Sequence, residues 1–481
     1  MNTAIACTEE KHLSKRMDTN GKAATTTTAI KRRLSKSNDL TTTTPEKRLR
    51  EDNNKSNGSK KVSSTVATVT KQKPKMITSD RIVRASQSRY RPYFVAENSE
   101  NSNDSRASPV GDPNLQTILE YPGDNENFLL LRPVLKNSSS TSNNSSNSHN
   151  HKTLQAVDDV EDKDEYNPIT DLIRSAYFIY ECYLTPEQQD LLGDDSHGIM
   201  RNLNKHRNRR NANGFIEAVH DFNRVIRDLK AKGELSKNAK AMRHPSYDLA
   251  CHILYQVYSR TVAPQADALN NYQAFSNNVY GEINPILVKE FISKTKLNSH
   301  SVFMDMGCGI GNVVLQVAAQ TGCEAYGIEI MEVPCKCAKR QLKEYAARMK
   351  AWRLPTGKIH FRHGDFLDVG SSDMYQTLKR ATVLLVNNYA FDWETNHSLA
   401  QLFLDLNEGT KIISLKSFVP KTHKINQRTF HMPESILRVE EFEYFSEAVS
   451  WTNNGGTYYI ATVDRSRLKP FYEGMYRSSQ R

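Results

Sequence analysis

The stretch Ser301–Glu332, SVFMDMGCGIGNVVLQVAAQTGCEAYGIEIME, decides the fold of this 481-residue chain. It opens with an apolar run at 302–304 that is long enough only for a buried strand, and a turn with the glycine spacing G-x-G-x-G follows. The apolar segment 313–319 predicts a helix, and a second apolar run, 325–328, ends on Glu329. Strand, glycine turn, helix and acid-terminated strand form the first half of a doubly wound nucleotide-binding sheet.

The residues of this turn favour S-adenosylmethionine over a dinucleotide. Gly307, Gly309 and Gly311 let the backbone approach a ligand closely, but dinucleotide sites space their glycines as G-x-G-x-x-G. Asp305 precedes the first glycine, where a carboxylate repels a pyrophosphate and can hold a cationic amino group. Glu329, 24 residues after Asp305, can accept hydrogen bonds from both hydroxyls of a ribose. S-adenosylmethionine, which has an amino-acid tail and no phosphate, fits this pattern.

The net charge of +11 lies entirely in the first hundred residues. Residues 1–100 hold 21 Lys and Arg against 10 Asp and Glu, which leaves 44 of each sign in residues 101–481. Residues 1–85 are rich in Thr, Ser, Asn and Lys, and they have too few apolar side chains to offset the entropy of ordering. We therefore expect a disordered basic tail.

Two basic clusters in this tail, KRR at 31–33 and KRLR at 47–50, are spaced like a two-part nuclear import signal. They predict that the protein is located in the nucleus. The same charges suit sequence-independent contact with the phosphate backbone of nucleic acid. The alternative is a solvated tail without a partner.

Composition divides the rest of the chain into three segments. Residues 86–152 predict short strands followed by a flexible Ser/Asn loop. Residues 153–270 have apolar residues at helical spacing and predict a helical N-terminal subdomain. Its basic run 200–210 fits contact with nucleic acid or an acidic partner, and a solvated loop equally well. Residues 271–481 predict the S-adenosylmethionine-binding domain, in which the polar, aromatic segment 275–282 forms a lid over the ligand.

The remaining apolar runs complete a seven-stranded sheet. Further strands are expected at 358–362, 382–386 and 411–415, and a hairpin joins 449–452 to 457–462. Asp365 and Phe366 follow the first of these strands, where they can accept from the adenine amino group and stack on its ring. Two antiparallel strands at the end of a parallel sheet suit the class I, Rossmann-like fold of S-adenosylmethionine methyltransferases.

Membrane insertion, secretion and metal binding are not expected. The chain has no run of 18 apolar residues and no apolar segment typical of a secretory signal near its N-terminus. Its seven cysteines are scattered, which indicates reduced thiols. Cys335-x-Cys337 has no second pair at zinc-ligand spacing, so no metal site is predicted.

Six motifs together resemble the Dot-type (disruptor of telomeric silencing) histone H3 methyltransferases, in a fungal-like form. They are VFMDMGCGIGN, SNNVYGE, HGDF, LVNNYAF, IISLKSF and VSWT…GGTYY, and the resemblance covers roughly residues 160–470. The resemblance implies a SET-independent enzyme that transfers methyl groups from S-adenosylmethionine to a lysine in the globular core of nucleosomal histone H3. It also implies roles in chromatin silencing and the DNA damage response. The implied partner is the nucleosome, with contacts to other histones and to DNA through basic segments.

The resemblance also implies the site residues. Asn387 would lie beside the sulfonium and the target amine, and Tyr458 would line the lysine channel. A further hypothesis makes Tyr389, Phe391 and Trp451 walls of this channel; for Tyr389 and Phe391 packing in the core is the alternative. Asp305, Gly307 and Gly309 would contact the methionine portion of the cofactor, Glu329 the ribose, and Asp365 and Phe366 the adenine. The complete cofactor set is Tyr280, Glu282, Asp305, Gly307, Gly309, Glu329, Asp365, Phe366 and Asn387.

Methyl transfer is an in-line displacement on carbon, for which alignment of a neutral amine can supply most of the acceleration. Two alternatives remain. A nucleic-acid methyltransferase would carry an (Asp/Asn)-Pro-Pro-aromatic motif at Asn387-Asn388-Tyr389, but the prolines are missing here. A non-catalytic chromatin tether would not need the acids and the amide that this pocket retains. A nicotinamide dehydrogenase is least favoured by the glycine spacing.

Overall fold

The computed structural model describes residues 77–78, 89–94, 112, 114–133, 166–270, 281–368 and 372–479. The predicted import signals and most of the predicted lid, including Tyr280, lie outside these residues. Among the helices within them, none combines the length and the apolar character that a membrane span requires.

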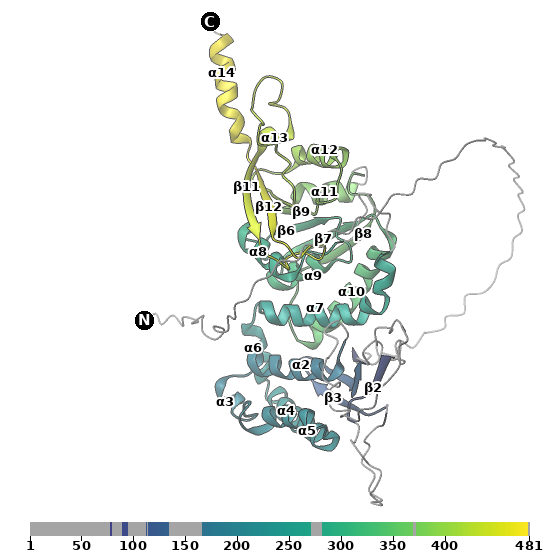
Figure 1. Ribbon diagram of the computed structural model, residues 1–481. Helices are drawn as coiled ribbons and strands as arrows, with labels where there is room; N and C mark the ends of the chain where they lie inside the picture. The colour runs from purple at the N-terminus through teal and green to yellow at the C-terminus, as the bar shows by residue number, and fades with distance from the viewer. Residues whose placement is uncertain are drawn as a thin grey trace, which may run out of the picture. The chain divides into compact units, whose positions relative to one another are not determined.

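A seven-stranded sheet forms the C-terminal half of the described chain (Figure 1). Its strands are β6 (Val302–Met306), β7 (Glu324–Glu329), β8 (Ile359–His363), β9 (Val383–Val386), β10 (Lys411–Ser414), β11 (Leu437–Tyr444) and β12 (Gly456–Val463), in the order β11-β12-β10-β9-β6-β7-β8. β12 is antiparallel to both of its neighbours, whereas the other pairings in this sheet are parallel. This order and this single reversed strand confirm the predicted class I, Rossmann-like methyltransferase fold.

The predicted hairpin is wrong in one of its strands. β12 pairs along its whole length with β11, from Leu437 opposite Val463 to Tyr444 opposite Gly456. Val449 makes only isolated bridges, to Ile283 and Thr452. The sequence of β11, LRVEEFEY, does not show the apolar pattern of a strand, because β11 lies at the sheet edge and carries the charged residues that edge strands tolerate.

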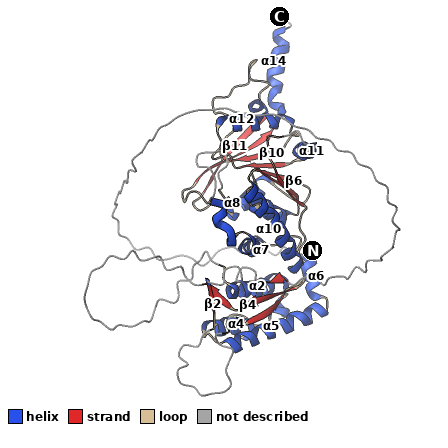
Figure 2. Ribbon diagram, turned by 90° about the vertical axis from the view of Figure 1, so that its right-hand side faces the viewer, coloured by secondary structure: helices blue, strands red, loops and turns tan. Residues whose placement is uncertain are grey.

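Helices cover both faces of the sheet (Figure 2). On one face Phe303 packs with Val288 of α8 and Val314 of α9, and on the other Met304 packs with Leu378 of α11 and Leu399 of α12. The helices in this half are α8 (Pro285–Thr295), α9 (Asn312–Thr321), α10 (Glu332–Ala351), α11 (Ser372–Arg380), α12 (Trp393–Leu402), α13 (Pro433–Ile436) and α14 (Lys469–Ser479). Successive residues of a strand point to opposite faces of the sheet. Because helices cover both faces, the side chains of the central strands are buried on both.

Short strands and helices precede the sheet in the chain. The strands are β1 (Ile77–Thr78), β2 (Tyr90–Pro92), β3 (Gln116–Glu120), β4 (Asn125–Leu129) and β5 (Leu131–Pro133). The helices are α2 (Pro168–Tyr183), α3 (Pro186–Gln189), α4 (Gly198–Asn208), α5 (Ala212–Ala231), α6 (Glu234–Ala241) and α7 (Tyr247–Thr261). The basic run at 200–210 is largely helix α4, which packs on α5, and not a loop.

A wholly buried ion cluster joins these N-terminal elements to the sheet half. Arg260 of α7 lies 2.7 Å from Glu126 of β4 and 2.8 Å from Asp171 of α2. Arg348 of α10 donates to the same Glu126 carboxylate at 2.8 Å. Burial alone would raise the pKa of Glu126, but the two guanidiniums hold it below its usual value. Strand β4 is thereby tied to α7 and α10, and these two helices pack on each other.

Candidate cofactor and active site

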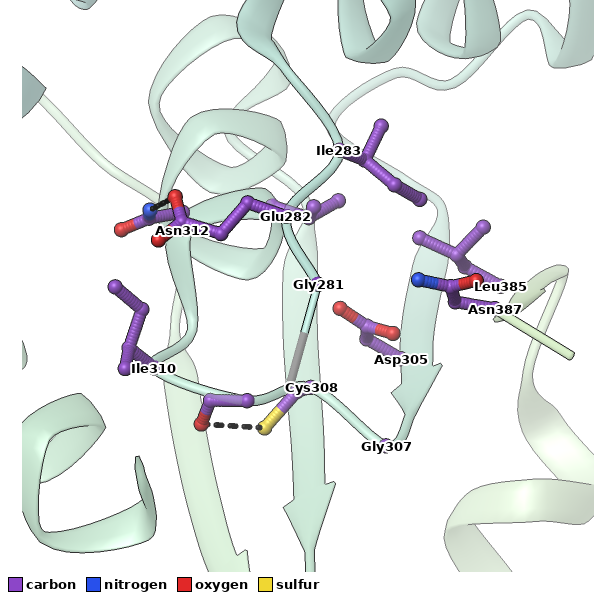
Figure 3. Close-up of a pocket in the computed structure, with 12 residues that line it drawn as sticks. Gly281, Glu282, Ile283, Asp305, Gly307, Cys308, Ile310, Asn312, Leu385 and Asn387 are labelled. Atoms are coloured by element: carbon purple, nitrogen blue, oxygen red, sulfur yellow. Dashed lines mark hydrogen bonds between the residues drawn. The ribbon is translucent and has the colours of Figure 1, made fainter. Parts of the chain in front are cut away.

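A cavity lies at the carboxyl ends of β6 and β9, where the chain connections leave toward opposite edges of the sheet (Figure 3). This topological switch point is where open α/β sheets bind their ligands. In Figure 3, Asp305 and Asn387 lie on one side of the cavity, and Glu282 with Asn312 on the other. The lining residues are Gly281, Glu282, Ile283, Asp305, Gly307, Cys308, Gly309, Ile310, Asn312, Val313, Leu385 and Asn387.

The glycine turn needs its glycines for backbone conformation and for space. Gly307, Gly309 and Gly311 have φ angles of 91°, 53° and 84°, in the left-handed region that side chains disfavour. A Cβ at position 311 would lie 2.4 Å from the ring of Phe361. The turn is held against β7, because the amides of Gly307 and Cys308 both donate to the carbonyl of Ile328, at 2.9 and 3.0 Å.

Two buried carboxyls stand at this turn. Glu329 accepts from the amide of Gly309 at 2.8 Å and from the amide of Met331 at 2.7 Å, so it anchors the glycine turn from the end of β7. Burial raises the pKa of Glu329. Burial and the charge of Glu329 raise the pKa of Asp305 to about 8. At neutral pH, a cation that binds in the cavity would therefore favour the ionised form of Asp305.

The segment 281–284, which we call the strap, crosses beside the cavity between α9 and the β11–β12 connection. Ser450 donates its amide to the carbonyl of Glu282 at 2.9 Å, and the amide of Glu282 donates to Ser450 Oγ at 2.8 Å. On the cavity side, Glu282 Oε2 accepts from Asn312 Nδ2 at 2.8 Å. A Cβ on Gly281 would lie 2.8 Å from the ring of Trp451. The strap therefore has fixed contacts on both sides.

The two asparagines after β9 have different environments. Asn387 lines the cavity. Asn388 is buried: its Oδ1 accepts from the amides of Leu415 and Lys416, at 3.0 and 2.8 Å. Its Nδ2 donates to the Lys416 carbonyl at 3.1 Å and to Asn396 Oδ1 at 2.8 Å. Asn388 thus joins the turn after β9 to the turn after β10, and so holds the backbone that carries Asn387.

Aromatic side chains flank this edge of the sheet. The half-exposed ring of Tyr389 lies 5.5 Å from the ring of Trp451, and the rings of Phe366 and Phe391 lie 5.8 Å apart. A Cβ on Gly307 would be 3.9 Å from the Phe366 ring, which places that ring against the glycine turn.

Not all of the predicted site residues surround the cavity. Glu282, Asp305, Gly307, Gly309 and Asn387 line it, and Glu329 and Phe366 contact the glycine turn. The side chain of Asp365 is exposed, and its Oδ1 accepts from the amide of Leu367 at 2.8 Å.

Tyr458 does not line this cavity. It is wholly buried between the rings of Phe291 and Phe442, and its hydroxyl donates to Glu290 at 2.7 Å. The alternation of β12 directs this side chain into the core shared with α8 rather than into the cavity.

Sequence reasoning did not single out Cys308, Ile310, Asn312 or Asn388. The sequence does contain a signal for Asn312, because this residue directly follows the last glycine of the turn and begins a helix. Asn388 carried no signal, because two adjacent asparagines cannot be assigned to a cavity and to a backbone clamp without the tertiary structure.

The sequence is similar to a known protein family. Residues 258–463 match the family model described as "Histone methylation protein DOT1". The "Histone-lysine N-methyltransferase, H3 lysine-79 specific" of Emericella nidulans is 37% identical over 374 residues, which cover 77% of this chain and 73% of that protein. The proteins of the same name from Aspergillus fumigatus and Yarrowia lipolytica are 40% and 43% identical; the matches cover 65% and 57% of this chain, and 62% and 55% of those proteins.

Proposed function

Because the chain belongs to the DOT1 family of histone methylation proteins, we propose that it transfers methyl groups from S-adenosylmethionine to lysine 79 of histone H3 in the nucleosome. The observation that carries the proposal is the buried carboxyl of Asp305 in a cavity at the switch point of a class I methyltransferase sheet. No described residue forms an ion pair with it. The ammonium group of the cofactor's amino-acid tail would supply the missing cation.

We assign each part of this cofactor to residues that line the cavity or contact the glycine turn. We assign the amino-acid tail to Asp305 and the glycine turn, and the ribose to Glu329, whose oxygens each retain a second lone pair. We assign the adenine to Phe366 beside Gly307. When bound, the cofactor supplies an electrophilic methyl group on a sulfonium.

Asn387 is the residue that we place at the reacting ends, because it lines the cavity at the end of β9. Tyr389 and Trp451 lie in contact beside it, and we propose that they form walls of the lysine channel. Such a channel aligns the amine and excludes water, which is the main requirement of an in-line methyl transfer. The hydrogen bond of Tyr458 to Glu290 favours a supporting role for that tyrosine behind the channel.

The test is to incubate the full chain with methyl-labelled S-adenosylmethionine and, separately, with nucleosomes, free histone H3 and naked nucleic acid. Label is expected on H3 in nucleosomes only, and it should be lost when arginine replaces lysine 79 of H3. Asp305→Ala serves as the inactive control. Label on nucleic acid would support a nucleic-acid methyltransferase instead, and cofactor binding without any label would support a non-catalytic tether.

The relatives' names refer to histone H3, which supports a role of this chain at chromatin. We propose that the basic tail at residues 1–100 directs it to the nucleus and, together with α4, contacts nucleosomal DNA. From Gly198 to Ile216 the chain has five Lys and Arg residues and no acid. Arg201 and Arg209 are exposed on the same side of the helix as Lys205, and no described residue forms an ion pair with any of the three. A helix face with one sign of charge suits a polyanion.

Salt dependence tests the interaction of α4 with DNA. Removing one cation that neutralises a phosphate should lower the slope of log affinity against log salt by about 0.9. The full chain in which Arg201, Lys205 and Arg209 are all changed to Ala should therefore show a shallower slope with duplex DNA in an anisotropy titration. The matched control changes Lys232, Lys237 and Lys240, which are exposed around α6, to Ala. Equal slopes for the two triple variants would count against DNA binding by α4.

A further inference from the structure

We propose that Gln341 is a positioning residue of the cofactor site: from α10 it orients Asn312, and through Asn312 it holds the carboxylate of Glu282 in the strap. This inference rests on the proposed cofactor site and adds to it a residue that lies outside the cavity. Gln341 is wholly buried on α10 and is not one of the residues that line the cavity.

Three hydrogen bonds form the connection. Gln341 Nε2 donates to the carbonyl of Ile310 at 2.7 Å and to Asn312 Oδ1 at 2.9 Å. Asn312 Nδ2 donates in turn to Glu282 Oε2 at 2.8 Å. An asparagine amide has a donor end and an acceptor end that can exchange by rotation. Because the Gln341 donor occupies the acceptor end of Asn312, the donor end must face the Glu282 carboxylate.

Stability does not explain a glutamine at this position. Cys337, one turn earlier on α10, and Tyr345, one turn later, are both buried. The Oε1 of Gln341 is also buried, and within the described part of the chain it has no hydrogen-bond partner. A buried acceptor without a partner is destabilising, and this cost offsets much of what the two Nε2 hydrogen bonds contribute to stability. We therefore attribute the role of Gln341 to its Nε2, which donates to Ile310 and Asn312, two residues that line the cavity.

The effect on Glu282 follows from the way in which the strap is held. The backbone of Glu282 is already bound to Ser450 on the side of the β11–β12 connection. The Asn312 amide holds its side chain on the α9 side. Without Gln341, Asn312 can rotate and turn its oxygen toward the Glu282 carboxylate, which repels it. We expect weaker cofactor binding, since Glu282 lines the cavity.

The first experiment compares Gln341→Met with the wild-type chain. Met removes the donor and preserves the volume. S-adenosylhomocysteine binding, measured by titration calorimetry, should weaken about tenfold, as expected for the loss of one or two hydrogen bonds. Urea unfolding should show little change in stability, because removing the unpartnered Oε1 offsets the loss of the hydrogen bonds to Ile310 and Asn312. In turnover, KM for S-adenosylmethionine should rise while kcat and KM for nucleosomes stay close to their wild-type values.

A double-mutant cycle with Asn312→Ala tests whether Gln341 acts through Asn312. In the Asn312→Ala background, Gln341→Met should have no further effect on S-adenosylhomocysteine binding. A tenfold effect that persists in this background, or no effect in the wild-type background, overturns the proposal. A wild-type chain that does not bind S-adenosylhomocysteine at all would instead contradict the proposed cofactor site.

Asn223→Leu is the matched control for loss of a buried amide. Asn223 of α5 donates to the Ile118 carbonyl at 2.6 Å and accepts from the Glu120 amide at 2.8 Å, away from the cavity. This variant should lower stability and leave S-adenosylhomocysteine affinity unchanged. If it weakens binding as much as Gln341→Met does, general destabilisation explains both variants and the positioning role is wrong.

Discussion

Asp305, the penultimate residue of β6, carries a carboxyl that is almost completely buried, with an exposed fraction of 3%. Burial and the neighbouring Glu329 raise its pKa to about 8, so at pH 7 the uncharged form predominates when no cation is present. A bound ammonium favours the ionised form and should lower this pKa. Cofactor binding is therefore coupled to release of a proton.

We expect up to one proton to be released for each S-adenosylhomocysteine bound between about pH 6 and pH 7.5. In this window the amino group of the ligand is protonated, because the pKa of an α-amino group is about 8. Affinity should rise with pH in this window, because less free energy is needed to ionise Asp305. Calorimetry in buffers of different ionisation enthalpy measures the proton directly. Asp305→Asn should bind weakly and release none; equal proton release by this variant would assign the proton to another group.

Asn387 and Asn388 are adjacent, and we expect their substitutions to have opposite effects. Asn387→Ala should reduce methyl transfer strongly with little change in stability, since the side chain lines a cavity. Asn388→Leu should cost about 1–3 kcal/mol of unfolding free energy, because the amides of Leu415 and Lys416 lose their acceptor. Urea unfolding and a single-turnover assay on both variants check this; a stable Asn388→Leu protein would show that its clamp is dispensable.

The glycine turn is an element whose backbone shape depends on neighbouring elements as well as on its own residues. Gly311 combines a left-handed φ with a position against Phe361 of β8. Gly233, before α6, has a similar φ of 76° but no atom near the position of an added Cβ. A comparison of Gly233 with Gly311 therefore separates the cost of a left-handed φ from the cost of a steric clash.

Gly233→Ala should cost about 1–2 kcal/mol, the strain of a left-handed alanine. Gly311→Ala should cost more, since its Cβ would lie 2.4 Å from the Phe361 ring, and it should also abolish S-adenosylhomocysteine binding. Equilibrium unfolding and calorimetry on both variants provide the comparison. Equal costs would mean that Phe361 moves freely and that the turn tolerates a side chain.

At the scale of the whole molecule, Glu126 connects the N-terminal strands to the helices beside the cofactor domain. It contacts both Arg260 and Arg348, and all three side chains are almost completely buried. Removing one member of a buried cluster leaves an uncompensated charge, which is far more costly than losing a surface pair. The cluster also confers pH dependence, because the ionised form of Glu126 is the one that the fold stabilises.

Glu126→Gln should lower the unfolding free energy by about 3–5 kcal/mol at pH 7. Since the folded pKa of Glu126 is lowered, its contribution is present above the unfolded pKa, about 4.3, and is lost as pH falls below it. The difference from wild type should therefore shrink in acid. Glu324→Gln is the control: it breaks the half-exposed pair with Arg380 and should cost about 0–1 kcal/mol. Similar costs for the two variants would contradict the importance of the buried cluster.

Local patterns were sufficient to predict the first half of the sheet and the glycine turn, and the structure confirms both. An apolar run, a set of closely spaced glycines and an acid at a strand end each reflect constraints within a few residues. β11 escaped recognition because its solvent-facing charges hide the alternation of an edge strand. The predicted hairpin partner of β12 was wrong for the same reason, since the observed partner is β11, the strand that precedes β12 in the chain.

The sequence alone determined the fold class, the cofactor class and five of the residues that line the cavity. Three of them, Asp305, Gly307 and Gly309, belong to one turn that is continuous in the chain, and the family resemblance supplied Glu282 and Asn387. The tertiary structure alone decided that Tyr458 packs in the core, that Asn388 clamps two turns, and that Gln341 reaches Asn312. Each of these depends on which side of a strand or helix faces which neighbour. It also placed Glu126 between two arginines, one of them 222 residues away in the chain, a contact that only long-range packing can create.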